Sequence, residues 1–261
     1  FTCLRKMPGN IVRFVQPDIL DSMGLRKHME YADIVFHLAA RVETPYADQN
    51  AHDFEQTNHW GNAKVVYAAE ELRVSQLIHL NSQSVYGEGK VTSTDHPRTA
   101  GSFYSVAKMR GEDHVLRLMD KLPVQLIRYA NVYGYSKNLR FESEINRLLF
   151  DEHFNNRISI HSHPNHALSY ISLYRTVEIL VQIALNELPS DVFNLSHRTL
   201  STYEVIEALR EFYPDRETIF VDQHIPRNNL TMTCDERLQP MLPLETSMVQ
   251  DIAKFRELFT F

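Results

Sequence analysis

The chain has few of the features that mark several specialised classes of protein. Its 2 cysteines, Cys3 and Cys234, are isolated among 261 residues, so neither a disulfide framework nor a cysteine zinc site is indicated. The net charge of −6 gives no general attraction to nucleic acid or to an anionic membrane. No apolar run approaches the roughly 20 residues that span a bilayer. We therefore expect a soluble globular protein in a reduced, cytoplasmic setting, with no nucleic-acid or membrane partner.

Short apolar runs alternate with helix-like segments along the chain. Continuous apolar runs are typical of strands that are buried on both faces of a parallel sheet. They span residues 11–15, 33–40, 75–80, 123–128, 169–172 and 191–196. Helices are predicted at 62–73, 104–120, 175–188 and 201–213, the last with Ser201 as N-cap and Glu204 completing a capping box. This alternation predicts an α/β fold with a doubly wound parallel sheet.

The best candidate for catalysis follows the run at 75–80, because ligands of open α/β sheets bind at the carboxyl ends of strands. Asn81 and then Ser82 follow this run, Tyr104 lies 22 residues beyond Ser82, and Lys108 follows one helical turn later. A lysine at i+4 lies on the same helix face as the tyrosine. Its charge favours the phenolate, whose ordinary pKa is ~10. With Ser82 bonding the reacting oxygen, the pattern suits proton transfer to a carbinol or carbonyl. For Tyr104 and Lys108 alone, an exposed helix start would be the better explanation, because polar pairs at i,i+4 are common on helices.

These residues stand in "YSVAK", preceded by "SQSVYG", and five other segments accompany them. The segments are "VQPDILD", "DIVFHLAA", "TNHWGNAKVVYAAEELRVSQLIHLNS", "LIRYANVYG" and "DVFNLSHRTLSTYEVIEAL". In order and spacing they resemble the extended short-chain dehydrogenase/reductase family, also called the NAD-dependent epimerase/dehydratases, over most of residues 10–210. The resemblance implies a Rossmann-like fold with a small C-terminal substrate-binding lobe. Residues 1–134 would form the dinucleotide-binding region. Residues 135–261 would mainly form the lobe, with segments returning to the sheet.

The resemblance also implies a role for each matching position. Tyr104 would be the general acid/base, Lys108 its electrostatic partner and a ribose contact, and Ser82 the anchor of the reacting hydroxyl. Further contacts to the cofactor are implied for Asp18, Ile19, Leu38, Ala39, Ala40, Asn58 and Tyr129, and contacts to the substrate for Ser84 and Asn131. Asn58 has an alternative interpretation as an ordinary residue at a helix N-terminus.

The first strand of the family and its glycine-rich loop have no match in the chain. That loop cradles the pyrophosphate of the dinucleotide on a helix N-terminus. We expect this unit of about 30 residues to lie outside the sequence. Its absence would explain part of the shortage of glycine, which contributes only 8 residues, against a usual share of ~7%. Arg5 and Lys6 stand at the end of what resembles the family's second strand. An arginine at that position suits the 2′-phosphate of the cofactor, so NADP(H) is favoured over NAD(H). A solvated basic turn is the alternative.

The substrate half departs from the family pattern. Leu168, Tyr174 and Arg175 replace an arginine and paired acids that are common in the family. The expected activity is hydride transfer at a sugar carbinol or ketone, most readily that of a nucleotide sugar. Gln83 and Ser84 argue against a dehydratase, which leaves an epimerase or a 4-keto reductase. The alternatives are a reductase of a non-sugar ketone or aldehyde, and a non-catalytic dinucleotide-binding scaffold.

Two further features concern metals and partners. His161, His163 and His166 lie within six residues and could together bind a metal. They lie in a polar segment where histidines are usually solvated, so no metal is expected. The helices at 62–73 and 104–120 often form a dimer interface in the family, so a homodimer is expected.

Overall fold

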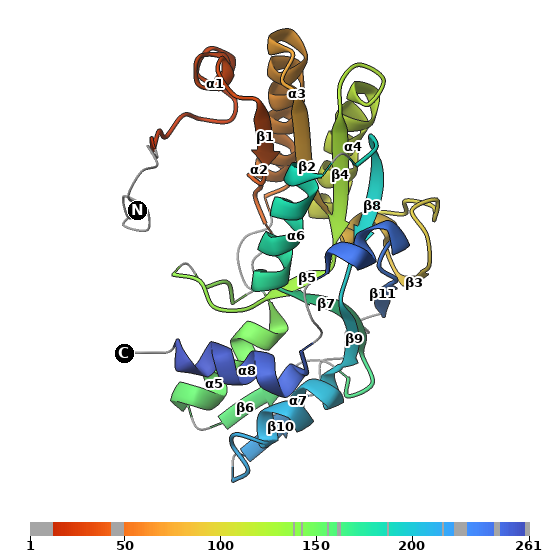
Figure 1. The fold of residues 1–261 in the computed structure, drawn as a ribbon. Helices are drawn as coiled ribbons and strands as arrows, with labels where there is room; N and C mark the ends of the chain where they lie inside the picture. Colours follow the sequence, from red (N-terminus) through yellow and green to blue (C-terminus); the bar gives the residue numbers. More distant parts are fainter. Residues whose placement is uncertain are drawn as a thin grey trace.

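The core of the fold is a four-stranded parallel sheet (Figure 1). The computed structural model describes residues 13–42, 50–137, 139–141, 143–155, 157–160, 163–186, 188–215, 217–221, 229–242 and 246–258. The sheet contains β1 (Ile34–His37), β2 (Gln76–Ser82), β4 (Val124–Tyr129) and β8 (Asp191–Leu195), in that spatial order. Because all four run in the same direction, their carboxyl ends meet at one edge, where a ligand site is expected.

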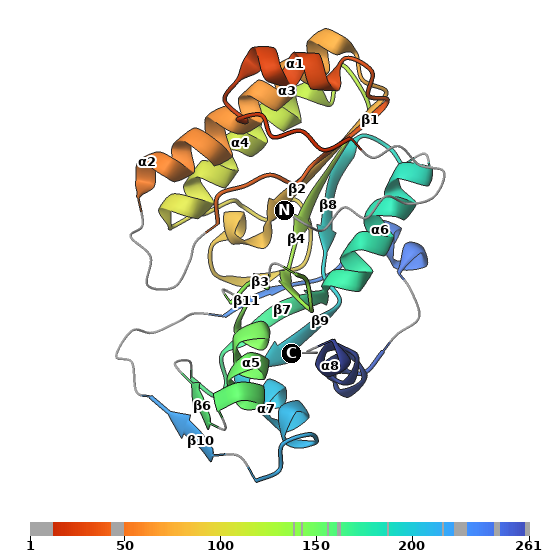
Figure 2. The ribbon, with the colours of Figure 1, turned by 90° about the vertical axis from the view of Figure 1, so that its left-hand side faces the viewer.

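Helices cover both faces of this sheet (Figure 2). On one face lie α1 (Ser22–Met29), α3 (Gly61–Leu72) and α4 (Phe103–Leu118), whose apolar side chains form one core cluster with β2 and β4. The other face is covered by α6 (Leu173–Leu185), which packs on β2, β4 and β8 through a second cluster. The doubly wound α/β fold is therefore confirmed.

An almost straight helical stretch precedes the second strand. It consists of α2 (Ala51–Phe54), the π-helix η1 (Glu55–Trp60) and α3. Gly111 of α4 packs directly against it, and a Cβ atom at that position would lie 2.1 Å from the carbonyl oxygen of Asn58. A glycine at this crossing lets α4 approach the π-helix closely, which brings the two helices that carry candidate site residues together.

A second lobe lies below the parallel sheet in Figure 1. Its main sheet has the order β3-β11-β7-β5, and β9 pairs antiparallel with β7. The strands are β3 (Gly89–Val91), β5 (Asn131–Tyr133), β7 (Ala167–Ser172), β9 (Arg198–Ser201) and β11 (Leu230–Met232). The remaining elements are β6 (Arg157–Ile160), paired with β10 (Glu217–Phe220), the helices α5 (Glu144–Asn155), α7 (Thr202–Arg210) and α8 (Met248–Glu257), and the 3₁₀ turns η2 (Gln83–Tyr86) and η3 (Glu236–Met241).

Two of the predicted strands differ from the structure. Residues 169–172 form part of β7, which belongs to the second sheet and not to the parallel one. The run is apolar because Tyr170 faces one core cluster and Ile171 another. Of the run at 11–15, the described residues 13–15 are not in a strand. The capping box of α7 is confirmed, since the amide of Glu204 donates to Ser201 Oγ at 3.2 Å and the amide of Ser201 to Glu204 Oε2 at 2.7 Å.

Candidate active site

Ser82 is the last residue of β2, at the carboxyl edge of the parallel sheet. The chain leaves the strand there and turns into η2, and Ser82 Oγ accepts the amide of Ser84 at 3.2 Å. Gly87 ends this turn with φ of 80°, and a Cβ atom there would lie 2.6 Å from the carbonyl oxygen of Thr99. The hydroxyl of Ser82 is thus held at the strand end and is only partly buried.

Tyr104 lies in the first turn of α4. Ser102 caps this helix in a reciprocal capping box: the amide of Ser105 donates to Ser102 Oγ at 3.1 Å, and the amide of Ser102 to Ser105 Oγ at 2.9 Å. The cap fixes where the helix begins and therefore the direction of Tyr104. The ring of Tyr104 is half-buried and meets Phe54 edge to face, with centroids 5.9 Å apart.

Lys108 follows Tyr104 by one turn and is only 2% exposed. Its Nζ donates to the carbonyl oxygen of Leu80 at 3.1 Å, two residues before Ser82. Burial lowers the pKa of Lys108 to about 8, although the carboxylate of Glu112 acts in the opposite direction. The ammonium therefore joins the helix face that carries Tyr104 to the strand that ends in Ser82.

Three of the other predicted residues lie at or just beyond this edge. Tyr129 ends β4 and is the registered neighbour of Ser82, and burial raises the pKa of its phenol. Asn131 begins β5, where its Nδ2 donates to the carbonyl oxygen of Ser169 at 3.2 Å. Ser84 lies in η2, and among the described residues its buried hydroxyl has no hydrogen-bond partner. A buried hydroxyl without a partner at the end of a strand is available to a ligand.

The carboxyl end of β1 carries Leu38, Ala39 and Ala40. Leu38 is 54% exposed, and Ala39 is exposed as well. The segment is tied down by Asn58, whose Nδ2 donates to the carbonyl oxygen of Arg41 and whose Oδ1 accepts its amide, both at 2.8 Å. Asn58 is fully buried within η1, so its interpretation as a helix N-terminal residue is wrong.

The N-terminal candidates lie apart from these strand ends in the sequence. Asp18 is exposed, and its Oδ1 accepts the amide of Leu20 at 2.9 Å in a tight turn. The side chain of Ile19 packs against Gly61, the first residue of α3. Arg5 lies outside the described residues, so its contact to a cofactor stays a prediction.

A buried charge network lies directly beneath the Ser82 edge. Glu112 of α4 is fully buried, and Arg128 of β4 donates to it twice, from Nη2 at 2.5 Å and from Nε at 3.2 Å. Asn81 Nδ2 also donates to this carboxylate, and Arg98 Nη1 lies 3.1 Å from it. Arg128 Nη1 in turn donates to the hydroxyl of Tyr86 at 2.6 Å.

Two buried histidines lie beside the network. His37 Nε2 and Asn62 Oδ1 are 2.6 Å apart, and Asn62 Nδ2 lies 3.4 Å from His79 Nε2. Burial lowers the pKa of His37 to about 4 and that of His79 well below its ordinary value. Both rings are therefore neutral at physiological pH.

Glu112, Arg128 and the histidine pair are not among the predicted site residues. Glu112 lies four residues after Lys108 and eight after Tyr104, so the helical period alone could have placed it on the same face. Arg128 and the histidines carried no such local signal.

The described residues contain no group of three or more histidine, cysteine or acidic side chains that could hold a metal ion. His161 lies outside the described part of the chain. His163 Nδ1 accepts the amide of Asn165 at 3.2 Å, and His166 is buried. None of the helices that the structure describes is long and apolar enough to cross a membrane.

The fold is shared with solved structures of sugar-nucleotide enzymes. TunA, described as a NAD dependent NDP-hexosamine 5,6-dehydratase, is similar with a TM-score of 0.83 and 21% identity, over 97% of this chain and 84% of TunA. UDP-glucuronic acid 4-epimerase from Bacillus cereus, in complex with UDP-glucuronic acid and NAD, is similar with a TM-score of 0.82 and 20% identity, over 94% of this chain and 80% of that one.

Curated relatives show a weaker likeness in sequence. The dTDP-D-glucose 4,6-dehydratase of Homo sapiens is 27% identical over 189 residues, which are 70% of this chain and 53% of that protein. The Mus musculus protein of the same name is 26% identical over 217 residues, 79% of this chain and 61% of that one. The chain therefore spans little more than half the length of these relatives.

The family model named Epimerase, described as the NAD dependent epimerase/dehydratase family, matches residues 2–156. This range contains Ser82, Tyr104, Lys108 and the whole of the parallel sheet except β8. The match confirms the resemblance carried by "YSVAK" and "DIVFHLAA", and the chain belongs to the NAD dependent epimerase/dehydratase family.

Proposed function

We propose that the protein is an NAD(P)-dependent enzyme that transfers hydride at a sugar carbinol or ketone. The observation that carries this proposal is the buried ammonium of Lys108. It is bonded to Leu80 at the end of β2 and lies one turn from Tyr104. A cation held at that place lowers the cost of a tyrosinate, which a general base requires and a non-catalytic scaffold does not.

In the oxidative direction Tyr104 accepts the proton of the substrate hydroxyl as the C–O bond becomes a carbonyl. Ser82 donates a hydrogen bond to the same oxygen and stabilises the charge that develops on it. Lys108 stabilises the tyrosinate before the transfer. In the reductive direction Tyr104 returns the proton. A bound nicotinamide ring supplies the acceptor or donor of the hydride.

The residues around the strand ends fit the nicotinamide end of a dinucleotide. The exposed Leu38 and Ala39 offer a small apolar surface, and Asn58 fixes the backbone behind them. Lys108 and Tyr104 of α4 would contact the ribose. The preference for NADP(H) rests on Arg5 and Lys6, and comparison of NADH and NADPH dissociation constants tests it.

We propose a nucleotide sugar as substrate and an epimerase or a 4-keto reductase as the type of enzyme. Relatives and structural neighbours that act on dTDP-glucose and UDP-glucuronic acid support the substrate class. Gln83 and Ser84 follow Ser82, so the chain offers no carboxylic acid there for the elimination step of a dehydratase. Leu168 at an expected arginine position favours a non-sugar ketone or aldehyde as the second candidate.

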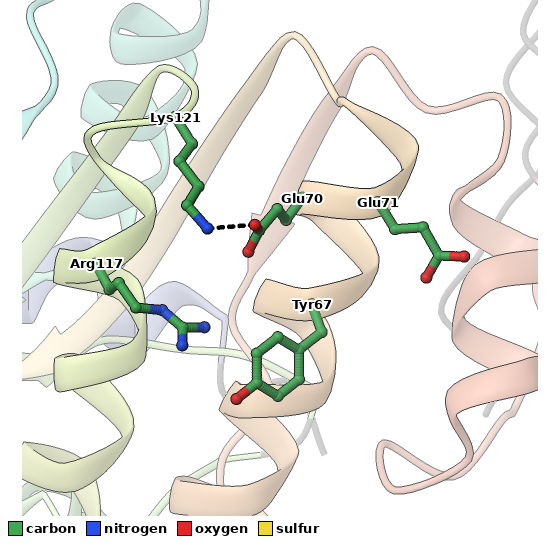
Figure 3. A pocket seen from close by; sticks show the side chains of 5 residues that line it. All are labelled: Tyr67, Glu70, Glu71, Arg117 and Lys121. Carbon is green, nitrogen blue, oxygen red and sulfur yellow. Dashed lines mark hydrogen bonds and ion pairs between the residues drawn. The ribbon is translucent and has the colours of Figure 1, made fainter.

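We also propose a homodimer, formed by the outer faces of α3 and α4. Tyr67 and Trp60 are 44% and 49% exposed, and the ring of His114 lies within 6.0 Å of the Tyr67 ring and stacks on His59, which stacks on Trp60. Figure 3 shows the adjoining pocket, which Tyr67, Glu70, Glu71, Arg117 and Lys121 line. Aromatic rings beside charges of both signs suit a second copy of the same face, related by a two-fold axis.

The experiment that tests the function uses the full-length protein. NADH and NADPH binding is measured first, and turnover is then followed with a panel of UDP- and dTDP-sugars and with simple ketones and aldehydes. Binding and turnover of a nucleotide sugar support the proposal. Turnover of the simple carbonyl compounds alone supports the second candidate, and cofactor binding without turnover of any compound supports a non-catalytic dinucleotide-binding scaffold.

The isolated cysteines support a cytoplasmic location, which fluorescence microscopy of the tagged protein checks.

A further inference from the structure

Glu112 is the buried acid nearest in sequence to the proposed proton-transfer residues. Tyr104, Lys108 and Glu112 follow one another at four-residue intervals, so they lie along one face of α4. The carboxylate is fully buried and receives donors from both sides, Asn81 of β2 and Arg128 of β4. It therefore contacts the residue that directly precedes Ser82.

We infer that Glu112 is a positioning residue of the proton-transfer site, which holds the Ser82 end of β2 against α4 and keeps the buried Lys108 in its charged form. The inference rests on the proposed function and adds to it a residue that touches neither substrate nor cofactor. It acts through Asn81 on the position of Ser82, and through its charge on Lys108.

The electrostatic part follows from the groups that face Lys108. Glu112 comes from α4, His79 from β2 and His37 from β1. The two histidines are neutral and give no support to a cation. Among these groups Glu112 is the anion, and it opposes the effect of burial on the pKa of Lys108. Without it the ammonium would lose its proton at a lower pH, and Tyr104 would lose its cationic partner.

A purely structural role for Glu112 is the competing explanation, because it forms a buried pair with Arg128. Removal of one member of such a pair leaves an uncompensated charge and destabilises the fold. The double variant Glu112→Gln/Arg128→Gln removes both charges and so separates the two explanations. A structural role predicts that its Lys108 titrates as in the wild type. A positioning role predicts a lowered pKa, since the carboxylate of Glu112 is the charge that opposes the effect of burial on the pKa of Lys108.

The experiment is an NMR titration of the lysine side chains in the full-length protein labelled with ¹³C at lysine Cε. Loss of one signal in Lys108→Met assigns the resonance. We expect Glu112→Gln, and the double variant, to lower the pKa of Lys108 by about one unit, while Glu112→Asp keeps it near the wild-type value. Asp113→Asn is the matched control: Asp113 is the next residue of α4, it also pairs with Arg98, at 2.9 Å, and its side chain is 57% exposed.

An unchanged Lys108 titration in the folded single or double variant overturns the inference, and so does failure of both variants to fold. The titration needs neither cofactor nor substrate. A protein that shows the expected shift but no turnover would therefore contradict the proposed function and leave the role of Glu112 intact. In an active protein, Glu112→Gln is expected to reduce kcat about twofold at pH 7 and about tenfold at about pH 9, where both proteins are past their Lys108 pKa, with little change in the KM for the cofactor. The alkaline limb of the kcat profile of this variant is expected to move to lower pH by the same amount as the pKa of Lys108.

Discussion

The carboxyl ends of β1 and β2 are neighbours in the sheet, yet they are built in opposite ways. At β2 the polar groups behind Ser82 are buried and charged: Lys108 bonds to Leu80, and Asn81 bonds to Glu112. At β1 the chain presents Leu38 and Ala39 to solvent, and a neutral amide, that of Asn58, fixes the backbone. We infer from this difference that the charged groups on the β2 side stabilise a reacting group, whereas the β1 side offers an apolar surface on which a cofactor fits.

Substitution of Tyr104 by phenylalanine removes the proposed chemistry of the β2 side most directly. The change removes only the hydroxyl, so the contact with Phe54 is kept while the proton donor and acceptor is lost. We expect kcat to fall by about 10²- to 10⁴-fold, with the dissociation constant of the cofactor changed little. Steady-state kinetics and fluorescence titration measure both. A variant with undiminished turnover would show that Tyr104 is not the acid/base.

The pH dependence of activity and of stability tests the role of Lys108 on the same side. Activity that requires the Lys108 charge should fall about tenfold for each pH unit above its pKa of about 8. Stability should behave differently. Between about 8 and 10.5, the ordinary value, the unfolded chain binds the proton and the folded chain does not, so the contribution of Lys108 to stability rises with pH.

Parallel kcat and thermal-unfolding profiles separate the two effects. Lys108→Met serves as the control, because it should lose both the alkaline limb of its activity and this contribution to stability. A wild-type alkaline limb that coincides with unfolding would contradict the assignment to Lys108.

Substitution of Asn58 by alanine tests the β1 side. It removes two hydrogen bonds to the backbone of Arg41, and we expect a loss of about 1–3 kcal/mol in the free energy of unfolding. The segment 38–41 would then be held less firmly, so cofactor affinity should fall several-fold while kcat at saturation changes less. Asn155→Ala, at an exposed position of α5, is the matched control. A kcat effect as large as that of Tyr104→Phe would remove the distinction between the two sides.

The outer faces of α3 and α4 lie away from both strand ends, and changes there should affect chemistry least. Tyr67→Ala combined with Arg117→Glu removes an exposed ring and reverses a charge at the pocket of Figure 3. We expect light scattering to report monomers in place of dimers, with turnover per chain within about twofold of the wild type. A dimer that persists would place the interface elsewhere.

The local parts of this site could be predicted from sequence, and the long-range parts could not. Tyr104 with Lys108 and Ser201 with Glu204 are encoded by spacings within one or two helical turns. By contrast, Tyr86 OH donates to Asn194 Oδ1 at 2.6 Å across 108 residues of sequence. Such pairs depend on which strands become neighbours. The run at 169–172 is predicted in the parallel sheet but belongs to the second sheet for the same reason, since an apolar run shows burial but not the identity of the partner strand.

The most direct test of the account follows the hydride itself. The full-length protein is incubated with a 4-keto nucleotide sugar and with reduced cofactor that carries deuterium on nicotinamide C4, and the sugar product is then analysed by mass spectrometry. Both proposed types of enzyme, an epimerase and a 4-keto reductase, would deliver this deuteride to the ketone carbon. We expect deuterium on that carbon of the product with the wild-type protein and almost none with Tyr104→Phe. Absence of deuterium from the reduced sugar, or equal labelling in the two proteins, would contradict the proposed hydride transfer.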